Sequence, residues 1–251
     1  MGIPVLILFA FLWGIPIRRK QKACGQLTKK QLKKALLLGL FPAALLILLA
    51  DNLGGLLLEM GGNLVLHLQG LDGSFQTTLL YQALLCFLVV ALFEERIKLR
   101  FARRSLRGCE GLTKADTMVL FGAVGLGYEI AETVVFSFQG GGAVMGVLRG
   151  IFLSHVMWQM YMGAAWHDAQ KLRESGGANA GREAKKILRR GFLVPYIIHG
   201  VNDFLLELAQ VLLAEGASGA SEGLGVLVFL LVLGLNVFNA VLCMRKFKQA
   251  L

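Results

Sequence analysis

The chain has 251 residues, a formal net charge of +10 and a mean hydropathy of +0.64, and 56% of its residues are hydrophobic. Soluble domains of this length are less apolar, and their apolar residues are interrupted at helix or strand period. The composition therefore excludes an ordinary soluble domain and indicates a membrane protein.

The apolar residues come in blocks of roughly 17–25, the length that an α-helix needs to cross a bilayer. Seven blocks are predicted to be transmembrane helices, near 2–17, 35–57, 77–97, 118–138, 144–166, 190–213 and 224–244. We therefore expect an all-α, polytopic bundle that forms a single transmembrane domain over residues 1–251. Basic residues follow the first block rather than precede it, so that block is expected to be an anchor rather than a cleaved signal peptide. The Gly-containing stretch 54–70 is expected to lie in the membrane interface or to re-enter the membrane.

The basic residues fall in alternate loops. Segments 18–34, 96–114, 171–190 and 245–248 hold 25 of the 26 Lys and Arg residues. The positive-inside rule then places the N-terminus outside and the C-terminus in the cytoplasm. The positive charge is thus a topology signal and an attraction to anionic lipid. The bilayer is an expected partner, and a nucleic acid is not.

The remaining basic residue, Arg149, falls inside the fifth predicted span, where it is accompanied by other ionisable groups. An ionisable group at membrane depth costs about 2.5–3.5 kcal/mol even on the lenient insertion scale. These groups are therefore expected to face one another or a wet cavity. They are Glu94, Glu95 and Lys98 at the end of the third span, Glu129 and Glu132 in the fourth, His155 in the fifth, and His199, Asn202, Asp203 and Glu207 in the sixth.

Spacing adds to this pattern. His199 and Asp203 are four residues apart and share a helix face, so the Asp can accept a ring N–H of the His and fix its tautomer. Glu94 and Lys98 are also four residues apart, with the acid first, which is the favourable order. At 1.5 Å per residue, His155 and His199 lie at a similar depth, roughly 12–15 Å from the cytoplasmic boundary. The two histidines are therefore expected to contribute to one site.

Each feature taken alone has an ordinary structural interpretation. Glu94 and Glu95 could be a solvated helix end, and Arg149 could be an ion-pair partner for an acid on another span. Glu129 and Glu132 could form a proton or cation path. These interpretations do not explain why four successive predicted helices carry, in order, a pair of Glu, a Glu, a His and the motif His-x-x-x-Asp.

The motifs occur in a fixed order: EERIK at 94–98, AVGLGYEIAET at 123–133, RGIFLSH at 149–155 and HGVND at 199–203. Over about residues 90–206 this order resembles the PrsW family of bacterial intramembrane proteases, within the superfamily that includes the CAAX prenyl endopeptidases. The family has Asn where this chain has Thr133, and Glu129 is not part of its pattern. The resemblance implies a peptidase in the bacterial plasma membrane that cleaves membrane-anchored proteins, with anti-sigma factors as one substrate class.

Two mechanisms remain open. In the first, Glu94 or Glu95 takes a proton from water, and histidines donate to the oxyanion. In the second, His155 and His199 with an acid ligate zinc, which leaves one position for water. The absence of an HExxH motif favours metal-independent catalysis, with zinc as the alternative cofactor. The predicted catalytic residues are Glu94, Glu95, His155, His199 and Asp203, supported by Lys98, Glu132 and Arg149.

An alternative from a different class is a non-catalytic membrane scaffold or a proton-coupled carrier that uses the same buried charges. A carrier usually shows inverted repeats or matched broken helices, and neither is visible in this sequence. The scaffold subunit of gamma-secretase belongs to the same superfamily but lacks the paired Glu. The paired Glu therefore favours an enzyme.

Overall fold

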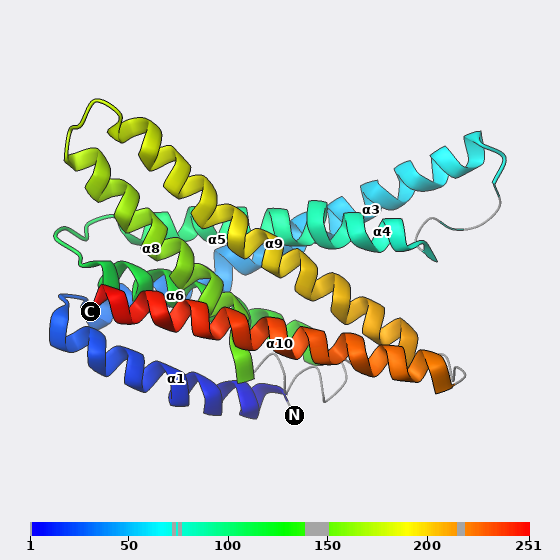
Figure 1. Ribbon diagram of the computed structural model, residues 1–251, viewed down its shortest axis with the longest axis horizontal. Coiled ribbons are helices and arrows are strands. Elements are labelled where there is room, and N and C mark those ends of the chain that lie inside the picture. The colour runs from blue at the N-terminus through cyan, green and yellow to red at the C-terminus, as the bar shows by residue number, and fades with distance from the viewer. Residues whose placement is uncertain (1, 72–73, 75–76, 139–150, 215–218) are drawn as a thin grey trace. The chain divides into compact units, whose positions relative to one another are not determined.

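The computed structural model describes residues 2–71, 74, 77–138, 151–214 and 219–251, and every regular element among them is helical (Figure 1). The predicted all-α class is thereby confirmed for the described part of the chain. Arg149, which we predicted to be a supporting residue, lies outside the described residues.

The helices follow the apolar blocks, but several extend beyond them. Two π-helical segments, η1 (Gly39–Ala43) and η3 (Leu85–Ala91), join α2 to α3 and α4 to α5. α9 begins before the predicted block because the charged residues that precede the block are good helix formers. In chain order the α-helices are α1 (Gly2–Cys24), α2 (Lys29–Leu38), α3 (Ala44–Leu68), α4 (Leu79–Leu84), α5 (Leu92–Ser105), α6 (Lys114–Phe138), α8 (Ser154–Glu174), α9 (Ala180–Ala214) and α10 (Gly219–Ala250).

Among the described residues, four helical runs are long and apolar enough to cross a membrane: Lys29–Leu68, Lys114–Phe138, Ala180–Leu213 and Glu222–Ala250. They correspond to the second, fourth, sixth and seventh predicted spans. The first predicted span falls on α1 and the third on α4, η3 and α5. Of the fifth, residues 144–150 lie outside the described residues, and most of the rest falls on α8. The orientation of these helices in the membrane stays a prediction.

The stretch 54–70, expected to lie in the interface or to re-enter the membrane, is continuous helix as far as Leu68, and its place relative to the membrane stays a prediction. Gly54 lies where α3 packs against η3. A Cβ atom at Gly54 would lie 2.7 Å from Cγ1 of Val89, which is closer than real Cβ contacts. The missing side chain therefore allows a close approach of two helices, the usual use of Gly between membrane helices, rather than a break.

The chain forms two compact units from segments that alternate along the sequence. Unit 1 contains Met1–Leu45, Arg96–Pro195 and Phe238–Leu251, and unit 2 contains Leu46–Glu95 and Tyr196–Val237. Helices α3, α5, α9 and α10 therefore each contribute residues to both units. The single-domain organisation stays a prediction.

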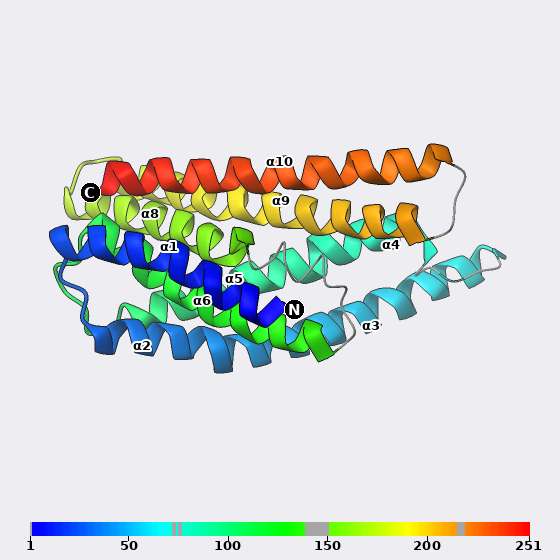
Figure 2. The ribbon, with the colours of Figure 1, turned by 90° about the horizontal axis from the view of Figure 1, so that it is seen from below.

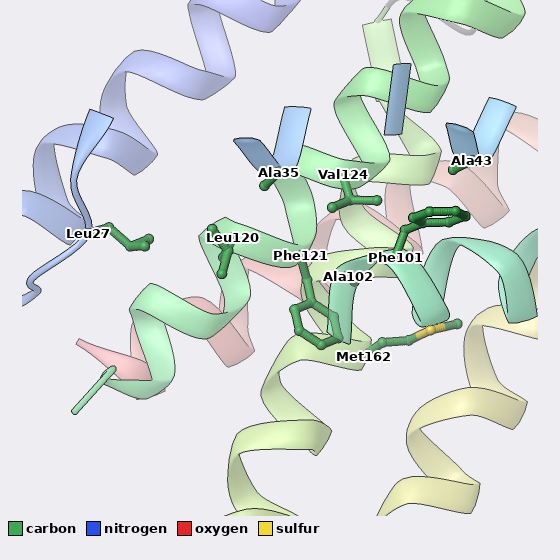
Figure 3. Packing of buried hydrophobic residues seen from close by; sticks show 9 residues of the cluster. All are labelled: Leu27, Ala35, Ala43, Phe101, Ala102, Leu120, Phe121, Val124 and Met162. Carbon is green, nitrogen blue, oxygen red and sulfur yellow. The ribbon is translucent and has the colours of Figure 1, made fainter. Parts of the chain in front are cut away.

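In unit 1, α6 packs against α1, α2, η1 and α8 (Figure 2). Small side chains in the core of this unit let the helices approach closely. Figure 3 shows one hydrophobic cluster of this core, formed by Leu27, Ala35, Ala43, Phe101, Ala102, Leu120, Phe121, Val124 and Met162.

The beginning of α6 is tied to the loop between α1 and α2 by the buried Asp116. Its carboxylate accepts the backbone N–H of Thr113 at 3.0 Å and that of Gln26 at 3.1 Å, and also the side-chain amide of Gln21. The hydroxyl of Thr113 accepts the backbone N–H of Asp116 in return, which caps the helix. One carboxylate therefore fixes the start of α6 and the preceding loop together.

In unit 2, α9 packs on η3 and on α10. Gly200 of α9 faces the ring of Phe87, and the rings of Phe87 and Tyr196 meet edge to face with centroids 6.4 Å apart. Gly225 of α10 faces Leu213 of α9. These contacts hold α9 between η3, which leads into the turn with Glu94 and Glu95, and α10.

Candidate active site

Unit 2 gathers three carboxylates around His199, those of Glu94, Glu95 and Asp203, and we call these four residues the His199 cluster. Nδ1 of His199 lies 2.9 Å from Oε1 of Glu95, and Nε2 lies 3.0 Å from Oδ2 of Asp203 and 3.8 Å from Oε2 of Glu94. Glu94, Glu95 and His199 are at most 2% exposed. The contact expected from the spacing of His199 and Asp203 is present.

Local backbone geometry places these groups. The π-helical segment η3 ends at Ala91, directly before the turn that carries Glu94 and Glu95. π-Helical turns are rare and occur frequently at functional sites, because the extra residue changes which side chains share a face. Regular α-helix over 199–203 then puts Asp203 one turn from His199.

The His199 cluster continues into two buried asparagines. The amide nitrogen of Asn202 donates to Oδ1 of Asp203 at 3.2 Å, and that of Asn236 donates to Oδ1 of Asn202 at 2.7 Å. Asn236 also donates to the carbonyl of Val232. Asp203 thus contacts His199 with one oxygen and Asn202 with the other. Asn236 was not predicted as a site residue, and its signal in the sequence is that it is one of two amides, with Asn239, within an apolar block.

Unit 1 contains a second group, which we call the His155 cluster. Nζ of Lys98 lies 2.7 Å from Nδ1 of His155, and Nε2 of His155 lies 2.7 Å from Oε2 of Glu132. Lys98 is fully buried, and its Nζ lies 4.7 Å from the ring centroid of Tyr128 and 5.7 Å from that of Trp158. Cation–π attraction adds to the hydrogen bond in holding the lysine at the histidine. The sequence predicted Lys98 as a partner of the paired Glu and did not predict its contact with His155.

Glu129 has a clear structural role. Its Oε2 accepts the backbone N–H of His155 at 3.1 Å, at the N-terminus of α8. Leu153, the residue directly before α8, has the left-handed dihedrals φ 45° and ψ 51°, and α8 therefore begins at Ser154. A carboxylate at a helix N-terminus satisfies an otherwise unpaired donor and is stabilised by the helix dipole.

Close packing of α6 on α8 makes this contact possible. A Cβ atom at Gly125 would collide with the backbone carbonyl of His155. Only glycine therefore allows α6 to approach α8 at this level, where Glu129 and Glu132 can reach the start of α8.

The two histidines have opposite electrostatic surroundings. A lysine ammonium only donates, so Nδ1 of His155 accepts from Lys98 and the ring proton belongs on Nε2, facing Glu132. Ionised carboxylates only accept, so His199, with carboxylates at both nitrogens, is satisfied when both nitrogens carry hydrogens. His155 is thus suited to be a neutral donor and His199 a cationic one.

The His155 cluster also has the donor set of a metal site. Glu129, Glu132 and His155 can each offer one ligand atom, and these atoms lie within 4.8 Å of one another. One imidazole nitrogen with carboxylate oxygens fits zinc. Because Lys98 occupies Nδ1, Nε2 is the ring nitrogen that would face the ion.

The structure brings together the predicted residues Glu94, Glu95, His199 and Asp203 in one cluster. It brings Lys98, Glu132 and His155 together in the other. The participation of both histidines in one site, and their joint ligation of a metal, stay predictions.

Comparison with known proteins gives the family. No curated protein and no solved structure matches the chain. A family model described as PrsW family intramembrane metalloprotease matches residues 28–236, a range that includes both clusters and ends at Asn236. The chain therefore belongs to the PrsW family of intramembrane metalloproteases and is a membrane-embedded peptidase.

Proposed function

We propose that the chain cleaves membrane-anchored protein substrates with a water molecule activated by Glu94 or Glu95. The observation that carries this proposal is the buried contact of His199 with Glu95 on one ring nitrogen and with Asp203 on the other. This arrangement provides bases and a cationic donor within one set of hydrogen bonds, which hydrolysis of a peptide bond requires.

In the proposed reaction, one of the paired carboxylates takes a proton from water, and the resulting hydroxide attacks the carbonyl carbon. The carbonyl oxygen becomes an oxyanion, which accepts a hydrogen bond from His199. The carboxylic acid then gives its proton to the leaving amine as the C–N bond breaks. A hydrogen bond to an oxyanion stabilises it more in a water-excluded site than in water. Glu94, Glu95 and His199 are almost fully buried.

We propose that the His155 cluster serves the same reaction. Support comes from α5, because this one helix carries Glu95 of the first cluster and Lys98 of the second, three residues apart. With Lys98 on Nδ1, His155 can present only its Nε2–H as a donor to developing negative charge. Glu132 orients the ring until substrate binds.

Zinc is the alternative cofactor. The family is described as metalloprotease, and His155, Glu132 and Glu129 are the residues of the described chain that would hold an ion within one unit. A bound zinc ion would polarise a carbonyl and acidify water. The contact of Glu129 with the backbone of His155 then also orients a ligand.

We further propose the plasma membrane of a bacterium as the location and an anti-sigma factor as a substrate. Both rest on family membership, and neither rests on a contact in the structure.

The test is a comparison of new protein N-termini by mass spectrometry in host cells. The cells carry wild type, the double variant Glu94→Gln/Glu95→Gln, His199→Ala, or the control Glu222→Gln at an exposed site, at equal membrane abundance. Termini that appear with wild type and the control but vanish with both cluster variants identify the substrate and the side of cleavage. Identical profiles from all four under several stresses would contradict the proposal.

A further inference from the structure

The proposed reaction leaves unused an apolar cavity of about 330 Å³ in unit 1, which lies among α1, α2, α6 and α8. Its wall is almost entirely hydrocarbon, with Leu36, Leu126 and Met160 among the lining residues. Among the described residues that line it, two are charged, Arg18 of α1 and Lys33 of α2. An apolar cavity with two cations suits an amphipathic ligand with a negative head.

Arg18 provides a second, independent indication. Its Nη2 donates to the carbonyl of Leu27 at 2.8 Å, but its buried Nη1 has no hydrogen-bond partner among the described residues. A buried donor without an acceptor is costly. The nearby carboxylate of Asp116 already accepts from Gln21, Gln26 and Thr113. Nη1 of Arg18 can therefore donate to an acceptor from a bound ligand, and the planar donors of a guanidinium match the geometry of phosphate oxygens.

Lys33 borders a second apolar hollow of about 440 Å³ along α2 and η1. This hollow is lined by Lys30 and Lys34 next to Lys33, and then by Leu37, Leu38, Phe41 and Pro42. Lys33 thus stands between two apolar volumes. A diacyl phospholipid has the same arrangement, because its two hydrocarbon chains extend from one charged head group.

We propose that unit 1 binds one anionic phospholipid, with its phosphate on Arg18 and Lys33, one acyl chain in the cavity and the other along α2. Charge complementarity selects this occupant, because segment 18–34 holds eight Lys and Arg residues and no Asp or Glu. Basic sites between membrane helices on the cytoplasmic side hold anionic head groups, and the positive-inside pattern places segment 18–34 on that side. The binding does not depend on peptidase activity.

The first experiment measures lipid selectivity. Purified full-length protein is equilibrated with vesicles of phosphatidylglycerol and phosphatidylcholine in equal amounts, and the lipid retained after purification is counted by mass spectrometry. Wild type should retain phosphatidylglycerol in preference, and Arg18→Gln/Lys33→Gln should weaken its binding by about fivefold for each charge removed. Lys20→Gln/Lys22→Gln removes the same charge from α1 at residues that line neither volume, and it should keep the preference.

A second variant tests the acyl chain. A Cβ atom at Gly14 meets no atom within 4 Å, and Gly14 lines the cavity, so Gly14→Leu should fill part of the cavity without a clash. We expect this variant to lose retained phosphatidylglycerol while Gly61→Leu, at an equally open position of α3, does not. Glycerol phosphate, which has the head without the chains, should not displace the lipid. Displacement by glycerol phosphate, or equal retention by Gly14→Leu and Gly61→Leu, would overturn the proposal.

Discussion

Nζ of Lys98 lies 2.7 Å from Nδ1 of His155, between the rings of Tyr128 and Trp158. A fully buried lysine is costly unless it is paired, so its position next to one ring nitrogen of a histidine has a functional explanation. The ammonium fixes the tautomer of His155 and directs the Nε2–H toward Glu132. Lys98 is therefore a positioning residue in the proposed mechanism.

Replacing Lys98 with Met should lower the cleavage rate by about 10–100-fold, the usual cost of losing a group that orients a functional histidine. Without the adjacent ammonium nothing holds the ring proton of His155 on Nε2, so kcat should fall while KM changes little. Lys98→Arg should recover part of the rate. The control is Lys114→Met, which breaks the 2.7 Å pair of Lys114 with Asp168 elsewhere in unit 1. A purely structural Lys98 would lower the amount of folded protein and leave kcat per folded molecule unchanged.

Hydrogen bonds connect His199 to Asp203, Asn202 and Asn236 in that order, and substitutions along this row should lower the cleavage rate less with distance from His199. Asp203→Asn removes the charge at Nε2 of His199 and should lower the rate by about 10–100-fold. Asn236→Ala removes the hydrogen bonds to Asn202 and to the carbonyl of Val232 but keeps the charge of Asp203, so a loss of about 2–10-fold is expected. Asn239→Ala, at another buried amide of α10, serves as the control. Rates measured on a purified substrate check the order, and an Asn236→Ala loss as large as that of Asp203→Asn would contradict it.

Two variants of Glu129 distinguish a role in capping α8 from a role in catalysis. Glu129→Gln keeps an oxygen that can accept the backbone N–H of His155, so stability should change little. Glu129→Ala leaves that buried N–H without a partner and should lower the free energy of unfolding by about 1–3 kcal/mol. Reversible unfolding in detergent measures both variants. A stable Glu129→Gln protein that has lost all activity would argue instead for a direct role of the carboxylate, as a metal ligand has.

Metal removal tests the choice between the two mechanisms. Under the glutamate mechanism, dialysis of the purified protein against a chelator should leave the cleavage rate unchanged, and elemental analysis should find less than one zinc ion per chain. Under the zinc mechanism, activity should be lost and then restored by zinc, and His155→Ala should abolish metal binding as well as activity. Elemental analysis gives a readout that does not depend on activity.

The helices could be predicted because apolar blocks of bilayer length have few other folds available. Their ends were predicted less well, since charged residues such as Lys185 and Arg189 continue α9 in helical form. The continuous helix through Gly54 and Gly55 could not be predicted, because helix packing decides whether a glycine breaks a helix or allows a close contact. The same holds for the left-handed Leu153, which no local signal marks.

At the candidate site, the contact of His199 with Asp203 followed from spacing on one helix. The contact of Lys98 with His155 did not, because it joins residues 57 apart, and a lysine beside two glutamates has a local explanation that is sufficient by itself. The capping role of Glu129 depends on where α8 begins, which is set by Leu153. Contacts within one helix could therefore be predicted from the sequence, and contacts between helices could not.

We propose that the His199 cluster performs the hydrolysis, and the decisive measurement is cleavage of a substrate by purified protein in lipid vesicles. The substrate is the membrane protein identified from its new N-terminus, and the variants are Glu95→Gln, His199→Ala and the exposed control Glu222→Gln. We expect a loss on the order of 10²–10⁴-fold for the two cluster variants and an unchanged rate for the control. Cleavage by folded Glu95→Gln and His199→Ala proteins at the wild-type rate would contradict it.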